Sequence, residues 1–291
     1  MEKVQRMKQF KLKNEFLEVD FINLGARITS IKVPNKNGIF GNVVLTTEDY
    51  TNDKIYLNTI CGPTAGRIKN ASFEIDGEIF NVEKNDNNNN LHGGSSGFHN
   101  VYFDSFLKEN SVIFTYKRPH NEGGFPGNLD VSISYSLSKD SLIINYEAIS
   151  DKPTLINLTN HAYFNLSGVE EEITSHTLKV PSEFFLETNS ENIPTGNLIN
   201  VKNHEFDFRE EKNVIKNIDH PFILDEDTIV LTHPNSGRRL VVKTKEKAAV
   251  IFTGNSKAIC IETQSTPDKH NVLRPGEVYK TETILKFEVI K

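Results

Sequence analysis

Long runs of alternating apolar and polar residues are the feature that most constrains how this chain can fold. Between residues 129 and 137, Leu, Val, Ile, Tyr and Leu occupy every second position, with Asp and Ser between them. Successive side chains of a β-strand point to opposite faces, so this pattern predicts a strand with one buried and one solvent-facing side. Segments 17–21, 141–148, 238–244, 248–254 and 281–291 repeat the pattern.

Turn-forming clusters separate these segments, among them "PNKNG", "NEGGFPGN", "SDKP", "PNSG" and "RPGE". No convincing amphipathic helix is longer than about three turns. The segment 281–291 comes last in the chain and must pair with strands that are already formed, which favours one continuous sheet system. We therefore predict a mostly β protein, a large antiparallel β-sandwich with few short helices, in a single domain over residues 1–291.

The composition argues against several classes of partner. The 33 basic and 39 acidic residues give a net charge of −6, which neither phosphate backbones nor anionic lipids would attract. No apolar run approaches the roughly 18 residues of a membrane span. The first 20 residues are charged and lack the apolar core of a signal peptide. Cys61 and Cys260 lie in apolar, strand-like stretches and are expected to be buried free thiols, so we predict a cytoplasmic protein.

One carboxylate stands on a face that should be apolar. In "AICIETQSTPD" the alternation places Glu262 on the same side of a strand as Ala258 and Cys260. Burying a carboxylate is costly unless it has a partner or a function. Such surroundings also raise its pKa, which suits a base that works near neutral pH.

Three further polar residues lie at transitions between predicted strands and loops. His161 stands in "TNHAYFNLSG", between an asparagine and an aromatic pair, and His92 precedes two glycines in "LHGGSSG". Arg67 follows small residues in "CGPTAGRIKN". Taken singly, each histidine could be structural, Arg67 a salt-bridge partner and Glu262 the partner of a nearby lysine. Their joint presence favours acid–base chemistry on a polar, uncharged substrate.

Cofactor and metal motifs are missing from the sequence. It contains no HxH, HExxH or CxxC spacing, no G-x-G-x-x-G and no P-loop. The serines in "HGGSSG" are a weak indication of a nucleophile. We therefore expect neither a metal nor a nucleotide cofactor.

Several long segments, in the right order, resemble the aldose 1-epimerase (galactose mutarotase) family. They are "NLGARITSIKVPNKNG", "AGRIKNASFEIDG", "NNLHGGSSGF", "EGGFPGNLDVSISYSL", "LTNHAYFNLSG", "IDHPFIL" and "IETQSTPDKHN". The resemblance runs nearly from end to end. It implies a sandwich of the galactose mutarotase type and a cofactor-free interconversion of the α and β anomers of free aldoses such as galactose and glucose.

The resemblance also implies roles for individual residues. Glu262 would be the general base at the C1 hydroxyl and His161 the general acid at the ring oxygen. His92 and Arg67 would hydrogen-bond the sugar. Asp219, in "IDHPF", would accept hydrogen bonds from sugar hydroxyls, and Gln264 would complete the substrate site and help to orient it.

Three departures from the family pattern put the substrate preference in doubt, but not the reaction type. Pro63 stands where many relatives have arginine, Gly66 where some have asparagine, and Phe103 where tryptophan is common. We expect these changes to touch the rim and the stacking surface of the site.

Two alternative functions remain open. A hexose-6-phosphate mutarotase would need an Arg or Lys cluster, yet only Arg67 and Lys69 lie near the motifs before Lys269. A non-catalytic carbohydrate-binding protein could use the same fold, but it would have no need for both His161 and Glu262. The sequence does not decide whether galactose or glucose is the preferred substrate, or whether the protein is a monomer or a homodimer.

Overall fold

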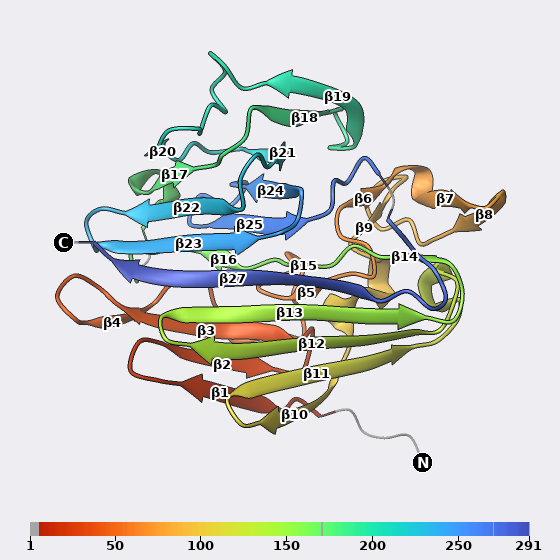
Figure 1. The fold of residues 1–291 in the computed structure, drawn as a ribbon, viewed down its shortest axis with the longest axis horizontal. Helices are drawn as coiled ribbons and strands as arrows, with labels where there is room; N and C mark the ends of the chain where they lie inside the picture. Colours follow the sequence, from red (N-terminus) through yellow and green to blue (C-terminus); the bar gives the residue numbers. More distant parts are fainter. Residues whose placement is uncertain (1–5, 170, 270, 291) are drawn as a thin grey trace.

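The computed structural model describes residues 6–169, 171–269 and 271–290. Its largest element is a nine-stranded antiparallel sheet that crosses the width of the molecule (Figure 1). In spatial order its strands are β10 (Asp104–Lys108), β11 (Ser111–Arg118), β12 (Leu129–Ser138), β13 (Ser141–Ser150), β27 (Tyr279–Val289), β23 (Arg238–Thr244), β22 (Thr228–His233), β17 (Thr177–Lys179) and β20 (Lys212–Asn213).

Two further antiparallel sheets pack against the nine-stranded sheet. The six-stranded sheet has the order β16 (Tyr163–Phe164), β25 (Ile259–Gln264), β24 (Ala248–Phe252), β21 (Asp219–Ile223), β18 (Phe184–Thr188) and β19 (Pro194–Asn200). The four-stranded sheet contains β1 (Gln9–Lys13), β2 (Glu18–Ile22), β3 (Arg27–Pro34) and β4 (Phe40–Asn42). A bridge between Val44 and Phe164 connects these two sheets.

Short strand pairs and turns complete the chain. The pairs are β14 (Thr154–Leu155) with β26 (Val272–Leu273), β15 (Thr159–Asn160) with β5 (Ile60–Cys61), β6 (Arg67–Ile68) with β9 (Asn90–Leu91), and β7 (Ser72–Ile75) with β8 (Glu78–Asn81). Within the described residues the helices are 3-10 turns: η1 (Lys69–Ala71), η2 (Gly94–Ser96), η3 (Phe98–Asn100), η4 (Glu122–Gly124) and η5 (Ile173–Ser175). Among the same residues, no helix has the length and apolar character needed to cross a membrane.

The core lies between the sheets and follows from the alternation in the sequence. In β12 and β13 every second side chain is buried over most of each strand. Tyr135 from β12 packs against Phe21 from β2, with ring centroids 4.8 Å apart, and its hydroxyl donates to the carbonyl oxygen of Ala26 at 2.8 Å. Aromatic rings bury large apolar areas, so contacts of this kind supply much of the energy that joins the layers.

The predicted fold class is confirmed: the protein is mostly β and antiparallel. The C-terminal strand β27 lies between β13 and β23, where it joins the two halves of the nine-stranded sheet. Cys61 and Cys260 are free and buried, as expected. The quoted segment "IETQSTPDKHN" includes residue 270, which lies outside the described residues.

Candidate active site

A cavity of 250 Å³ brings together the six residues that the sequence predicted for the catalytic and substrate-binding site. Its walls come from the loops around the short pairs β5–β15 and β6–β9 and from one face of the six-stranded sheet. Six of the residues that line it are Arg67, His92, His161, Asp219, Glu262 and Gln264. These residues lie as much as 197 positions apart in the chain, so only the fold makes them neighbours.

Glu262 lies in a row of side chains that crosses the six-stranded sheet. Val250 in β24 pairs directly with Glu262, and Pro221 in β21 pairs with Val250. All three line the cavity. The Glu262 side chain is 4% exposed, and its burial beside apolar neighbours raises the pKa of its carboxyl to about 8. The negative charge of Asp219 adds to this rise, whereas Arg67 opposes it.

His161 is fixed through its backbone by residues 58 and 59. Its N–H donates to the carbonyl oxygen of Thr59 at 2.8 Å, and its carbonyl oxygen accepts from the N–H of Asn58 at 3.1 Å. The imidazole stacks on the ring of Tyr163, with centroids 5.0 Å apart and an interplanar angle of 29°. Burial lowers the pKa of this imidazole to about 4.

The two groups form a pair, because His161 Nε2 lies 3.4 Å from Glu262 Oε1. Burial drives both toward their neutral forms, a protonated carboxyl and a neutral imidazole. Between about pH 4 and about pH 8 the pair therefore holds one proton in total. A carboxylate facing an imidazolium has the same proton count. The pair can thus take a proton at one atom and release one at another without changing its charge.

Arg67 and Asp219 form the charged part of the cavity. Arg67 Nε contacts Asp86 Oδ2 at 2.7 Å, and its Nη1 lies 3.6 Å from Asp219 Oδ2. Burial raises the pKa of Asp219, and the Arg67 charge counteracts that shift. These two contacts position the guanidinium while its remaining N–H groups can donate to a ligand.

His92 is oriented by a backbone donor. The N–H of Gly66 donates to His92 Nδ1 at 3.2 Å, so the proton of the neutral ring is on Nε2. Burial, with the nearby His161, lowers the pKa of His92 well below its usual value. His92 is therefore a neutral hydrogen-bond donor. Its backbone has φ 53°, followed by Gly93 with φ 85°, where a Cβ would lie 2.6 Å from the oxygen of Gly62.

The same tautomer argues against a metal site. Among the described residues, His92, His161 and Glu262 have potential ligand atoms within 4.8 Å of one another. A metal needs a nitrogen lone pair, but His92 Nδ1 uses its lone pair on Gly66 and Nε2 carries the proton. This donor set suits an oxygen of a polar ligand better than a cation.

Gln264 is a buried residue of the cavity wall. It is fully buried, and its Oε1 accepts from Asn157 Nδ2 at 3.2 Å. Asn157 Oδ1 in turn accepts from the backbone N–H of Ser265 at 3.1 Å. Gln264 is thus placed to orient the end of β25, next to Glu262 on the same strand face.

The sequence reasoning missed several aromatic residues of the cavity. Tyr56, Tyr163 and Phe252 line it, and Lys54 lies at the same cavity. The motif "TNHAYFNLSG" contains Tyr163 two positions after His161, which is the strand spacing that places two side chains on one face, so this residue had a usable signal. No comparable pattern marks Lys54 or Tyr56.

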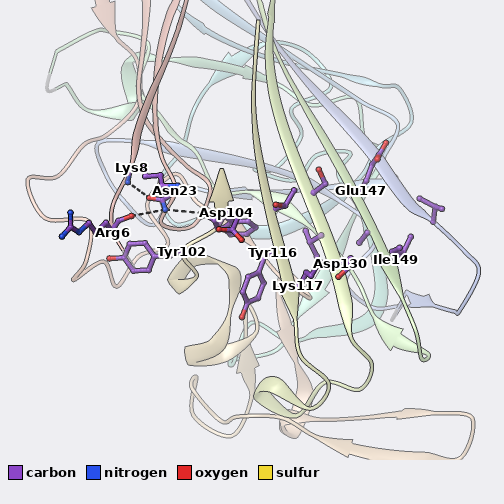
Figure 2. Close-up of a pocket in the computed structure, with 16 residues that line it drawn as sticks. Arg6, Lys8, Asn23, Tyr102, Asp104, Tyr116, Lys117, Asp130, Glu147 and Ile149 are labelled. Carbon is purple, nitrogen blue, oxygen red and sulfur yellow. Dashed lines mark hydrogen bonds and ion pairs between the residues drawn. The ribbon is translucent and has the colours of Figure 1, made fainter. Parts of the chain in front are cut away.

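A larger cavity of 710 Å³ lies elsewhere, between the N-terminal segment and strands β11 to β13 (Figure 2). Three of its charged side chains are bound to protein partners. Lys117 Nζ contacts Asp130 Oδ2 at 3.4 Å, and Glu147 Oε1 contacts Lys280 Nζ at 2.6 Å. None of the six predicted site residues lines this cavity.

Comparisons with known proteins relate this chain to one family over nearly its whole length. The family model described as aldose 1-epimerase matches residues 8–286. Human galactose mutarotase is 32% identical over 323 aligned positions, covering 97% of this chain and 94% of the human protein. This chain belongs to the aldose 1-epimerase family. The family's aldose 1-epimerase from Haemophilus influenzae is 34% identical and covers 88% of this chain and 85% of its own.

Solved structures show the same fold. Galactose 1-epimerase from Lactobacillus acidophilus superposes with a TM-score of 0.88 at 25% identity, covering 100% of this chain and 97% of its own. The aldose epimerase homologue from C. elegans has a TM-score of 0.92 at 24% identity, covering 98% of this chain and 100% of its own.

Of the three departures from the family pattern, one reaches the cavity. Gly66 lines it, whereas Pro63 and Phe103 do not. Phe103 is buried in the core, with its ring centroid 6.0 Å from Phe98 and 5.9 Å from Tyr116. The expectation that Pro63 and Phe103 touch the rim or a stacking surface of this cavity is therefore wrong.

Proposed function

We propose that this member of the aldose 1-epimerase family interconverts the α and β anomers of free hexoses such as galactose and glucose, with Glu262 as base and His161 as acid. Its relatives carry the names galactose mutarotase and aldose 1-epimerase, which supports an isomerase acting on a free sugar. The reaction breaks and re-forms the bond between C1 and the ring oxygen, and the protein needs to supply only proton transfers.

In the first step the Glu262 carboxylate takes the proton from the C1 hydroxyl. The electron pair of that O–H bond forms the C1 carbonyl, and the bond between C1 and the ring oxygen breaks. His161 gives its proton to the ring oxygen, which becomes the C5 hydroxyl of the open-chain aldehyde. The pair begins and ends this step with one proton in total, now on Glu262.

Ring closure then uses the same groups with exchanged roles. Rotation about C1–C2 presents the other face of the carbonyl to the C5 hydroxyl. His161 takes the proton of that hydroxyl, and Glu262 returns its proton to the carbonyl oxygen. Positioned proton transfer of this kind contributes about 10²–10⁴-fold, which suffices for a reaction that already proceeds in water.

The remaining groups of the cavity are suited to binding the sugar. His92 offers its Nε2–H, and Arg67 its free N–H groups, to oxygens near the ring. Asp219 offers a carboxylate as acceptor for sugar hydroxyls. Gln264, which is fully buried, would act by orienting the end of β25.

The observation that carries this proposal is the His161–Glu262 pair itself. A buried carboxyl and a buried imidazole lie 3.4 Å apart in a cavity large enough for one monosaccharide. Two such groups would be costly to bury without a function.

Polarimetry of freshly dissolved α-D-galactose and α-D-glucose tests the proposal. With little buffer to limit background, the wild type should speed the decay of optical rotation, and His161→Ala should lose that effect. His176→Ala is a matched control, because His176 is also buried but lies outside this cavity. If neither sugar responds to the wild type, the proposal is wrong.

A hexose 6-phosphate is a poorer fit to the cavity. Arg67 is bound to Asp86, and Lys54 is the other lysine or arginine among the lining residues. Glu262 and Asp219 line the same space, so a phosphate dianion would meet acidic groups there. The same polarimetric assay with glucose 6-phosphate decides this alternative, because a faster decay of its optical rotation would support a hexose-6-phosphate mutarotase. A sugar that binds without any change of rotation rate would indicate the carbohydrate-binding alternative.

Three further properties remain proposals. We propose a single domain over 1–291, which the family match over residues 8–286 supports. The buried free thiols of Cys61 and Cys260 are compatible with the predicted reducing cytoplasm. The oligomeric state, monomer or homodimer, stays a prediction.

A further inference from the structure

The turn formed by residues 53–58 has an unusual backbone at the edge of the cavity. Tyr56 has φ 57° and Asn58 has φ 55°. The left-handed region is rare for a bulky aromatic residue and is kept only where the surroundings impose it. Tyr56 also lines the cavity. The turn therefore places this ring at the cavity against the preference of its own backbone.

A buried ion pair imposes this conformation. Asp53 Oδ1 accepts from the N–H of Ile55 at 2.9 Å, and its Oδ2 accepts from the N–H of Leu57 at 2.8 Å. The same Oδ2 lies 2.9 Å from Arg27 Nη1, with side chains 1% and 5% exposed for Arg27 and Asp53. The carboxylate thus closes the turn on both sides of Tyr56, and Arg27 compensates its buried charge.

The ring of Tyr56 packs against three imidazoles. Its centroid lies 4.5 Å from that of His92 and 4.6 Å from that of His99, in both cases edge to face. It lies 6.1 Å from His161. His92 and His161 are themselves 5.6 Å apart. A single rigid ring therefore limits how the two cavity histidines can rotate and shift.

We propose that Tyr56 is a positioning residue that holds the imidazole rings of His92 and His161 in place for proton transfer. The Arg27–Asp53 ion pair supports it from outside the cavity, since neither residue lines that space. The inference rests on the proposed acid–base function of His161. To that function the inference adds Tyr56, which acts through the two histidines, and the Arg27–Asp53 ion pair, which fixes the backbone of Tyr56.

The kinetics of three variants and one control variant test the claim. Tyr56→Phe keeps the ring and should keep kcat within about twofold, whereas Tyr56→Leu should lower kcat about 10²-fold, because small misplacements of acid–base groups have effects of that size. The double variant Arg27→Met/Asp53→Asn removes both charges together, leaves no unpaired buried ion and should lower kcat about 10-fold or more. In both impaired variants kcat should fall by a larger factor than KM rises, because the sugar loses at most its contact with His92 and keeps those with Arg67 and Asp219.

The control variant is Arg274→Met/Asp76→Asn, an ion pair that is 47% and 58% exposed and lies outside the cavity. It should change neither kcat nor KM.

A second readout does not depend on activity. The Cε1–H signals of His92 and His161 should shift in the spectrum of the unliganded Arg27→Met/Asp53→Asn variant. The signals of His176 and His233, a separate pair 4.6 Å apart, should stay in place. Folded variants that keep both the wild-type kcat and the wild-type signals would overturn the inference. If the double variant does not fold, Tyr56→Leu decides by kcat alone.

Failure of the proposed function gives a different pattern. If the wild type does not act on any of the sugars, the acid–base assignment is wrong. The histidine signals would still show whether the ion pair positions the rings.

Discussion

Two cavities of this protein, the acid–base cavity and the larger one beside the N-terminal segment, differ in what their polar groups do. The larger one, of 710 Å³, has ion pairs on the protein surface along its wall, such as Lys117 with Asp130. The smaller one, of 250 Å³, contains a buried acid–base pair whose pKa values lie far from their usual range. Size alone would select the larger cavity, which none of the six predicted site residues lines.

The difference shows where the fold accepts a cost in stability. Paired surface charges contribute little, because water screens them and supplies alternative partners. Glu262 and His161 are instead removed from water and held close together. Such surroundings disfavour their charged forms and make a proton available near neutral pH. The following predictions, ordered by expected effect, test this contrast.

The largest effect is expected for Glu262→Gln. Glutamine has the size of glutamate but cannot take the C1 proton, so kcat/KM should fall about 10²–10⁴-fold. The measurement is the rate of rotation decay with α-D-galactose, together with circular dichroism to verify the fold. A variant that works at the wild-type rate would remove Glu262 from the mechanism.

Asp219→Asn should have an intermediate effect. A hydrogen bond to a charged acceptor is stronger than one to a neutral acceptor by about 1 kcal/mol, so KM should rise several-fold to about tenfold. The charge of Asp219 raises the pKa of Glu262, so the alkaline limit of activity should also move to lower pH. An unchanged KM would mean that the sugar does not contact Asp219.

Glu262→Gln should also change stability in a pH-dependent way. The pKa of Glu262 in the folded protein, about 8, lies above its usual value of 4.5, so the folded state binds a proton more tightly than the unfolded state. Stability from this group is therefore present below pH 4.5 and lost as the pH rises toward 8. The variant should show a higher Tm than the wild type at pH 8, and little difference near pH 4. A lower Tm at pH 8 would contradict the desolvation argument.

The smallest effect is expected in the larger cavity. Lys117→Met and Glu147→Gln each remove one member of an exposed ion pair. Free-energy changes below about 1 kcal/mol are usual for such pairs, so neither Tm nor kcat/KM should move appreciably. A marked loss of activity in either variant would show that the two cavities are coupled.

The strands were predictable because their alternation is local. The runs 129–137 and 141–148 became β12 and β13, whose side chains alternate between the core and the surface. The six site residues could be named from the sequence because each lies in a recognisable motif. Their convergence on one cavity depends on strand pairings between distant segments, such as β5 with β15.

The parts that the sequence did not reveal depend on long-range polar contacts. The role of Tyr56 follows from a carboxylate that closes its turn and from an arginine 26 positions before that carboxylate. Nothing in the local sequence indicates this pairing. Phe103 shows the opposite error. Its position in the family pattern predicted a place at the substrate site, but its apolar ring is buried in the core.

The pH dependence of kcat/KM for α-D-galactose tests the central claim most directly, since this parameter reports the groups of the free enzyme. If His161 and Glu262 share one proton, activity should form a plateau that falls below about pH 4 and above about pH 8. Activity falls at low pH because the His161–Glu262 pair gains a second proton. It falls at high pH because the pair loses its only proton. A rate that keeps rising through pH 8, or that does not depend on pH, would contradict the shared-proton mechanism.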